Sequence, residues 1–182
     1  MIKGSELIGG KIFDSNNHLM DYHVKELVYC LKKLKVLGLI VEKQPKGKGK
    51  KVVPYKKIKD IRQQEIVITS HREILSPSQI PEIEVALENP SVMIGFEIYG
   101  MKGELVGIVK DTLIEIKTGK IVALLISEGV LTDIINGYGI IFLSEHINFD
   151  KKNIILNHVN MNDMIYYQYG GLKKMLGIEQ EN

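Results

Sequence analysis

The sequence has no tryptophan, one cysteine and no long apolar run. A single cysteine, Cys30, excludes an intrachain disulfide and leaves no thiolate cluster for a structural zinc site. No apolar stretch approaches the roughly 20 residues that a membrane-spanning helix needs. The first residues also lack the charged-then-apolar order of a signal peptide. We therefore expect a cytoplasmic protein without a transmembrane segment.

Residue patterns for catalysis or for cofactor binding are also missing. Cys30 has no histidine or asparagine at a recognisable nucleophile motif, so we predict a buried, inert thiol. The glycine-dense stretches 47–51 and 137–139 match neither a dinucleotide fingerprint nor a phosphate loop. The five histidines are scattered, with none at metal-ligand spacing: His18, His23, His71, His146 and His158. We predict no catalytic residue, no metal site and no cofactor.

The net charge of +2 conceals an asymmetry along the chain. Residues 1–75 hold 16 basic and 8 acidic side chains, a net charge of +8, whereas residues 76–182 hold 8 and 14, a net charge of −6. Such a separation indicates either an anionic partner for the basic half or an attraction between the halves.

The stretch 103–129 has the pattern of a hairpin. Ile114 and Ile116 alternate with charged residues, which is typical of a half-buried strand. Residues 121–126 form a continuous apolar run rich in β-formers, which predicts a buried strand. Gly119 between them supplies the positive φ of a tight turn.

Much of this pattern occurs twice. The offset between similar segments stays between 85 and 88 residues over most of the chain, which predicts a tandem duplication. The matching segments are 7–13 with 93–99, 24–26 with 109–111, 36–41 with 121–126, and 66–68 with 154–156. We call residues 7–68 repeat 1 and residues 93–156 repeat 2. The duplicated acids Glu26 and Asp111 suggest either an acid–base pair or a structural role, and we favour the structural role.

Several short strands with regularly spaced turns predict a small antiparallel β-barrel in each repeat. We therefore predict a mainly β protein built from two tandem small antiparallel barrels with a short C-terminal helix. The expected boundaries are a basic domain at 1–75, a proline-containing linker at 76–91 in which residues 82–88 could form one helical turn, a second domain at 92–158 and a helical tail at 159–182.

The pattern Ile94-Gly95, Gly107-x-Val109-Lys110-Asp111 and Thr118-Gly119-Lys120 followed by the apolar run resembles the PRC-barrel domain family. Repeat 1 resembles it through residues 7–13 and through Val53-Pro54-Tyr55. Family members include the cytoplasmic part of the photosynthetic reaction-centre H subunit and the C-terminal domain of the ribosome-maturation factor RimM. The family also includes small stand-alone bacterial proteins, some of them linked to sporulation. Because both halves look like the same module, this chain resembles tandem stand-alone members. The resemblance implies a barrel that binds other macromolecules, not an enzyme.

Two interaction surfaces follow as hypotheses. The first is an apolar protein interface in a loop of repeat 2 and in the tail. The tail residues alternatively form a short helix that covers a barrel. The proposed contact residues are Val130, Leu131, Ile134, Ile135, Tyr166, Tyr169 and Met175. A non-catalytic adaptor or scaffold with a protein partner, which is either a second copy or another chain, is the favoured function.

The second hypothesis concerns the lysine-rich loop 43–51, which has no acidic residue. A flexible polycation neutralises phosphates, but no aromatic residue is interleaved for base stacking. The alternatives are a solvated loop, or contact with RNA, the ribosome or an anionic membrane surface in a maturation factor. The candidate anion-binding residues are Lys43, Lys46, Lys48, Lys50, Lys51, Lys56 and Lys57.

Overall fold

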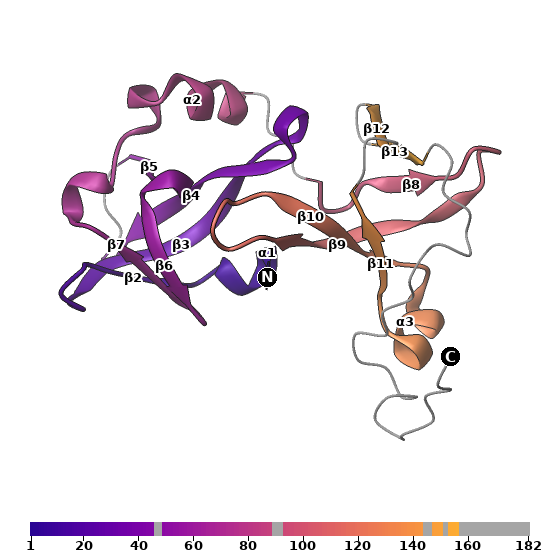
Figure 1. Cartoon of the computed structure of the whole chain (residues 1–182), viewed down its shortest axis with the longest axis horizontal. Helices are drawn as coiled ribbons and strands as arrows, with labels where there is room; N and C mark the ends of the chain where they lie inside the picture. The colour runs from indigo at the N-terminus through magenta and orange to yellow at the C-terminus, as the bar shows by residue number, and fades with distance from the viewer. Residues whose placement is uncertain (46–48, 89–92, 144–146, 151–152, 157–182) are drawn as a thin grey trace. The chain divides into compact units, whose positions relative to one another are not determined.

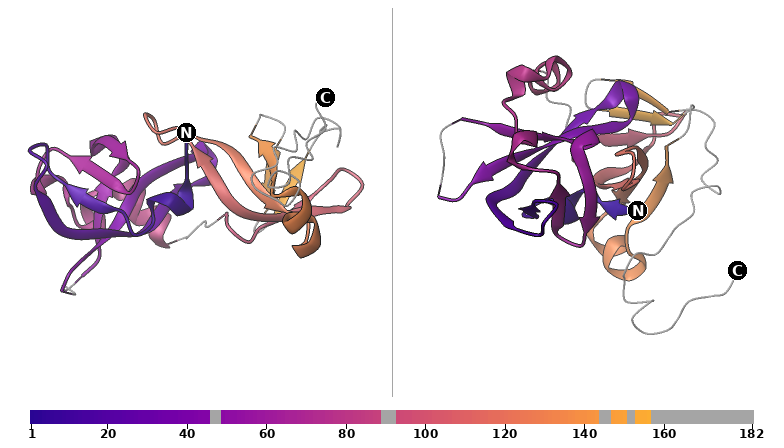
Figure 2. Two further views of the ribbon diagram at one scale, coloured as in Figure 1. Left: turned by 90° about the horizontal axis from the view of Figure 1, so that it is seen from below. Right: turned by 60° about the vertical axis from the view of Figure 1, so that its left-hand side comes forward.

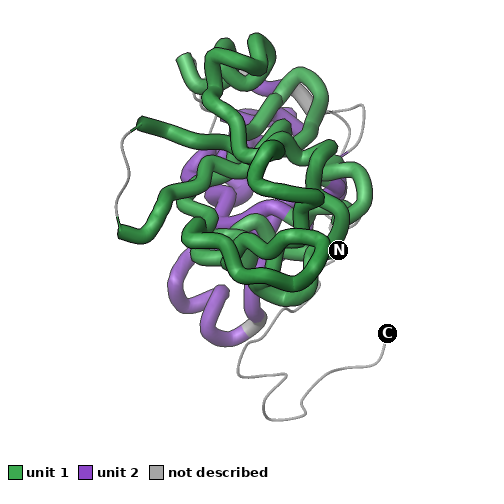
Figure 3. The backbone as a smooth tube through the Cα atoms, turned by 90° about the vertical axis from the view of Figure 1, so that its left-hand side faces the viewer, with its two compact units in different colours: residues 1–92, 113–121 green, residues 93–112, 122–182 purple. Residues whose placement is uncertain are grey.

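The computed structural model describes residues 1–45, 49–88, 93–143, 147–150 and 153–156. These residues are mainly β, in two sheets with short helices between strands (Figure 1). They fall into two compact units (Figure 3). Unit 1 comprises Met1–Val92 and Leu113–Ile121, and unit 2 comprises Met93–Thr112 and Val122–Asn182. The mainly β prediction is confirmed.

The first sheet has six strands in the order β5-β4-β3-β2-β7-β6. A long hairpin of β3 and β4 forms its centre, and the short β2 and β7 lie side by side. The bounds are β2 Lys11–Phe13, β3 Leu19–Cys30, β4 Lys35–Lys43, β5 Lys51–Pro54, β6 Ile58–Arg62 and β7 Glu65–Ile68.

The second sheet has the same order one repeat later, β11-β10-β9-β8-β13-β12. A seventh strand, β1 (Ile2–Lys3), pairs with β9 at Leu113 and Ile114. The bounds of the other strands are β8 Glu97–Tyr99, β9 Leu105–Ile114, β10 Ile121–Ser127, β11 Gly139–Phe142, β12 Ile147–Asp150 and β13 Asn153–Leu156. Its central hairpin, β9–β10, is again a long twisted ribbon (Figure 2).

The expectation of purely antiparallel sheets is wrong. The first and last strands of each repeat pair in parallel, β2 with β7 and β8 with β13. A parallel pair needs a long connection, and the four intervening strands supply one in each repeat. Both sheets are therefore mixed, in the same way.

The correspondence extends to single hydrogen bonds at the start of each repeat. The Gly9 N–H donates to the Val24 carbonyl at 2.8 Å, and the Gly95 N–H donates to the Val109 carbonyl at 2.8 Å. Fully buried side chains also occupy matching positions, including positions in the strand pairs β2 and β8, β4 and β10, and β7 and β13. The pairs, each with 0% exposure, are Leu7 and Met93, Ile12 and Ile98, Val36 and Ile121, Leu39 and Leu124, and Ile66 and Ile154.

The hairpin at 103–129 is present, with a longer connection than predicted. Strand β9 ends at Ile114 and β10 begins at Ile121, so Ile116 lies in the connection. Gly119 has a φ of 73°, and its N–H donates to the Glu115 carbonyl at 2.9 Å. Residues 113–121 belong to unit 1, where the Val36 N–H donates to the Gly119 carbonyl at 2.9 Å.

Residues 76–88 are part of unit 1, although the sequence predicted a linker at 76–91. The 3₁₀ turn Pro77–Gln79 leads into α2 (Pro81–Glu88), which lies over the first sheet (Figure 1). Ile83 is 1% exposed and packs in a cluster with Val28, Ile40 and Val52. Proline suits the first turn of a helix, where its missing N–H costs no hydrogen bond. The prolines therefore start this element instead of breaking it.

The remaining helical segments are short: α1 Gly4–Leu7, 3₁₀ turns at Leu31–Lys33, Tyr55–Lys57 and His71–Glu73, and α3 Val130–Asn136. The predicted C-terminal helix at 159–182 lies outside the described residues.

Candidate interaction surfaces

The lysine-rich loop is only partly described, since Lys46 and Lys48 lie outside the described residues. Lys43 ends β4 and is exposed, and Lys50 is also exposed. Lys51 begins β5, and its ammonium group donates to the Ser76 hydroxyl at 3.2 Å. Lys43 and Lys50 therefore present charge to solvent, while Lys51 is partly engaged within unit 1.

Lys56 and Lys57 lie in the 3₁₀ turn Tyr55–Lys57 and differ in their surroundings. The Lys57 ammonium pairs with the Glu73 carboxylate at 3.1 Å. Lys56 instead lines a small cavity in unit 1. Lys56 is thus the better placed of the two to meet an external anion.

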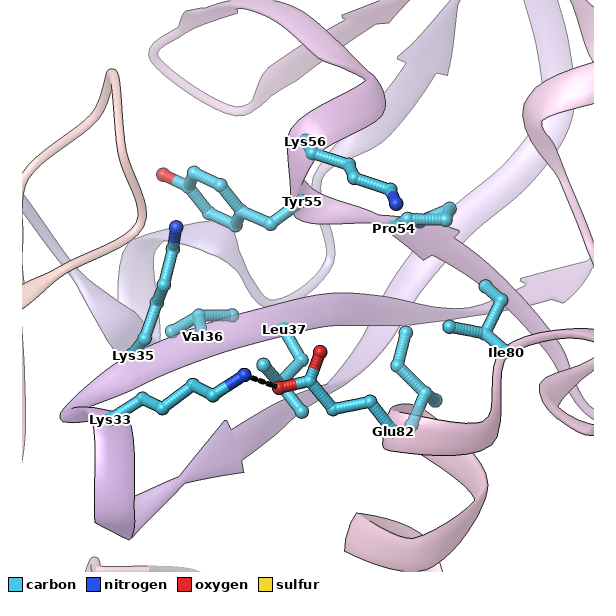
Figure 4. Close-up of a pocket in the computed structure, with 10 residues that line it drawn as sticks. Lys33, Lys35, Val36, Leu37, Pro54, Tyr55, Lys56, Ile80 and Glu82 are labelled. Atoms are coloured by element: carbon cyan, nitrogen blue, oxygen red, sulfur yellow. Dashed lines mark hydrogen bonds and ion pairs between the residues drawn. The ribbon is translucent and has the colours of Figure 1, made fainter.

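This cavity has a volume of about 160 Å³ (Figure 4). Its apolar wall comes from β4, from β5 and from the start of α2. Charged side chains surround the opening from three different segments of the chain. The lining residues are Lys33, Lys35, Val36, Leu37, Pro54, Tyr55, Lys56, Ile80, Glu82 and Ile83.

The three lysines of the cavity are not equivalent. The Lys33 ammonium pairs with the Glu82 carboxylate (Figure 4), and this contact raises the pKa of Lys33. Among the described residues, neither Lys35 nor Lys56 makes an ion pair. The opening therefore keeps two positive charges that no described carboxylate neutralises, a composition that favours anions.

Tyr55 closes the inner side of the cavity and is 4% exposed. Its hydroxyl donates to the Ile116 carbonyl at 3.0 Å. Burial, with a smaller contribution from the Glu115 carboxylate, raises the pKa of Tyr55 to about 12. The phenol is therefore neutral near pH 7 and serves to hold residues 113–121 in place.

The second surface is the apolar side of α3 in unit 2. The sequence predicted a loop at residues 130–135, but these residues are helical. Asp133 lies in the first turn of the helix, where the helix dipole favours an acid. Its carboxylate accepts a hydrogen bond from the Ser127 hydroxyl. Four apolar side chains of this helix are exposed by 75%, 76%, 50% and 44%, namely Val130, Leu131, Ile134 and Ile135.

Two more large apolar side chains of unit 2 are exposed near this helix in the sequence. Tyr138 follows it after one glycine, and Phe142 ends β11. The four exposed apolar side chains of α3 make this helix a candidate interaction site. The other predicted contact residues, Tyr166, Tyr169 and Met175, lie outside the described residues.

The residues considered for chemistry stay apart. Cys30 ends β3 and is half-buried, not fully buried as predicted. One Asp111 carboxylate oxygen accepts the Thr112 N–H at 2.8 Å, a local backbone contact that agrees with a structural role. His18 pairs with Asp14, whereas His146 and His158 lie outside the described residues. Within the described ranges, no three metal-ligating side chains come together.

The sequence pointed to lysines but missed the cavity. Lys33, Lys35 and Glu82 come from segments about 50 residues apart, and only the packing of α2 on the first sheet joins them. No local pattern announces such a site. The four apolar residues that the sequence proposed at 130–135 are exposed on α3, and their role as contact residues stays a prediction.

Comparison with known proteins gave one assignment. Residues 90–159 match the family model of the PRC-barrel domain, which covers the six repeat-2 strands and α3. No curated protein matches the chain. Among the described residues, no helix is both long and apolar enough to cross a bilayer.

Proposed function

Because the chain contains a PRC-barrel domain at residues 90–159, we propose that it is a non-catalytic adaptor that binds a protein partner through α3. One observation carries this proposal. The helix lies inside the matched domain and turns Val130, Leu131, Ile134 and Ile135 towards solvent. Burying such side chains against a partner contributes roughly 1.5 to 3 kcal/mol for each side chain that becomes fully buried.

The charge of unit 2 restricts the kind of partner that can bind to this surface. Unit 2 holds ten acidic and six basic residues, a net charge of −4, and Asp133 lies on the helix itself. An apolar centre with an acidic surrounding fits a partner whose contact face has apolar side chains and a basic rim. The proposed partner is therefore a protein segment of that composition.

We also propose that repeat 1 is a second, diverged PRC-barrel module and that each sheet closes into a small barrel. The shared strand order, the shared parallel pair and the matched buried positions support this proposal. The chain would then be a tandem protein. The resemblance of this chain to RimM and to the reaction-centre H subunit then extends only to the PRC-barrel module.

The adaptor proposal is tested with a photo-crosslinking amino acid at Leu131 in the full chain, expressed in its own cells. The matched control carries the same amino acid at Val85, a 59% exposed apolar residue on α2 of unit 1. We expect one protein to crosslink at position 131 and not at position 85, and Leu131→Asp in a tagged chain to lose that protein. Identical products at both positions, or no product at position 131, would overturn the proposal.

A polyanion such as RNA is the second candidate, and it is favoured by Lys35 and Lys56 at the cavity, which form no ion pair with any residue that the structure describes. Unit 1 holds most of the basic half of the sequence, and Lys43 and Lys50 are exposed beside a loop with further lysines. Lysine contacts of this kind release counterions, so binding weakens steeply as salt increases.

The test is a titration of the full chain with single-stranded RNA at several salt concentrations. Neutralising Lys46, Lys48, Lys50 and Lys51 to glutamine should flatten the dependence of the binding constant on salt. The control removes the same charge elsewhere, at the exposed residues Lys102, Lys110, Lys117 and Lys120. An equal salt dependence in both variants would exclude the loop as the contact.

A further inference from the structure

The first sheet shows how a repeat is completed after its last strand. Beyond β7, the chain runs along the outer edge of β5, where Val52 and Leu75 exchange two backbone hydrogen bonds of 2.9 Å each. It then forms α2, whose Ile83 packs on Ile40 and Val52. Residues 75–88 thus cover both an edge and a face of the first sheet.

The second sheet has the same edge in the same register. In the first sheet Val52 lies opposite Ile40, and in the second Ile140 lies opposite Leu125. Ile140 is 5% and Leu125 is 2% exposed, as buried as their counterparts. Antiparallel pairs alternate in the direction of their backbone groups. The N–H and C=O of Ile140 therefore point away from β10, as those of Val52 point away from β4.

The chain beyond β13 carries the pattern of the segment that covers the first sheet. A single offset of 89 residues aligns five apolar positions that contact the first sheet or its cluster with five apolar positions of the tail. Ile74 is not matched, because its counterpart is Asp163. The aligned pairs are Leu75 with Met164, Ile80 with Tyr169, Ile83 with Leu172, Ala86 with Met175, and Leu87 with Leu176.

We propose that residues 164–176 dock on the second sheet of their own chain, with Met164 paired to the β11 edge at Ile140 and Leu172 over Leu125 and Ile140. The length of chain agrees, since Leu75 lies seven positions after Ile68 and Met164 lies eight positions after Leu156. The repeat then extends to Leu176. Tyr169 and Met175 face the sheet in this arrangement, so α3 is the surface of unit 2 left for a partner.

An uncovered β11 edge would attract a foreign strand, because its backbone groups form a template for pairing. The tail would prevent this pairing in each molecule. A second copy could occupy the edge in the same geometry by exchanging its tail, and the test separates these two occupants.

The test is a disulfide between Ile140→Cys and Met164→Cys in the full-length Cys30→Ser protein. Val52 and Leu75 form a hydrogen-bonded antiparallel pair. The Cα atoms of such a pair lie about 5.5 Å apart, within reach of a disulfide. Val52→Cys with Leu75→Cys is therefore the positive control. Ile140→Cys with Gln168→Cys, four residues out of register, is the negative control. Products are read by non-reducing mass spectrometry at low protein concentration.

We expect an intramolecular disulfide in the Ile140–Met164 pair and in the positive control, and none in the negative control. A disulfide that joins two chains would assign the edge to a second copy and overturn the proposal. So would the absence of a disulfide in a protein whose positive control forms one.

A second measurement, urea denaturation, tests the proposal without the cysteine substitutions, in case those variants fold poorly. Leu172→Asp should lower the urea midpoint by about 1 M, as Ile83→Asp should in unit 1, whereas Tyr166→Asp should leave it unchanged. An unchanged midpoint in Leu172→Asp would overturn the proposal, whatever the cysteine variants show. The α3 crosslink is independent of both results, so the two proposals fail separately.

Discussion

The two repeats share strand order, register and core, but they differ in the segment that follows the central hairpin, between the third and fourth strands of each repeat. In repeat 1 this segment is a lysine-rich loop, and in repeat 2 it is the apolar helix α3. Burial constrains the sequence of the strands, since a change in a buried side chain disrupts its packing against its neighbours. The sequence of the connecting segment is constrained only by the need to join the two strands that flank it. The two sheets thus share a core arrangement and carry two chemically opposite connections.

The largest expected effect tests the equivalence of the two cores. Leu39→Ala and Leu124→Ala each remove a fully buried side chain at matching positions of β4 and β10. Each should lower the free energy of unfolding by about 2 to 5 kcal/mol, measured by urea denaturation. If one variant is nearly neutral while the other unfolds, the repeats are not structural equivalents.

The tips of the two central hairpins should respond in opposite ways. Gly119 has a φ of 73°, and a Cβ there would lie 2.7 Å from the Tyr55 ring. Gly119→Ala should therefore cost about 2 to 3 kcal/mol, from strain and from displacement of the ring.

Leu34, the counterpart of Gly119 at an offset of 85, has a φ of 46°. Leu34→Gly relieves the left-handed strain, worth about 1 to 2 kcal/mol, but loses a half-buried side chain, so urea denaturation should detect little net change. A large loss in Leu34→Gly together with a neutral Gly119→Ala would contradict the assigned geometry.

Alkaline pH should weaken unit 1 selectively. The pKa of Tyr55 is raised to about 12 by burial, above its unfolded value of about 10. The stabilisation is fully present below pH 10 and is lost as the pH rises towards 12, to a total of about 2 to 3 kcal/mol.

The counterpart of Tyr55 in repeat 2 is Leu143, which does not titrate. The measurement is urea denaturation of the wild type and of Tyr55→Phe between pH 9 and pH 12. A Tyr55→Phe protein that loses stability as steeply as the wild type would show that another group is responsible.

The smallest effect is expected at the turns that precede β3 and β9. Asn17 and Gly103 correspond at an offset of 86 and have φ values of 61° and 78°. Asparagine tolerates this conformation nearly as well as glycine. Asn17→Gly and Gly103→Asn should each change the unfolding free energy by under about 1 kcal/mol by thermal or urea denaturation. Gly103→Val, with a branched side chain, should cost more.

Periodicity in the sequence predicted the mainly β fold well, because alternation and apolar runs report burial directly, while the tandem duplication stays a prediction that the shared strand order of the two sheets supports. Three prolines between 77 and 90 suggested a linker with one helical turn at 82–88, where the structure has α2. The apolar spacing of Ile80, Ile83 and Leu87 could have indicated that this helix packs on unit 1. Helix α3 was mistaken for a loop, because its β-branched residues have weak helix propensity and Gly129 begins it.

The cavity of unit 1 lay beyond any sequence argument, since it depends on how α2 packs over β4. Parallel pairing of the first and last strands was equally hidden. Alternation of side chains specifies which face of a strand is buried, but not which way its neighbour runs.

The placement of residues 113–121 in unit 1 decides where the chain can be divided. A fragment that starts at residue 90 would contain the whole matched family segment and yet lack the Val36 amide and the Tyr55 hydroxyl, which bond to the far end of its longest hairpin. Deletion of either half of the chain therefore removes hydrogen-bond partners from the half that remains. Genetic dissection of this protein should rely on point substitutions on the two surfaces and leave the length of the chain intact.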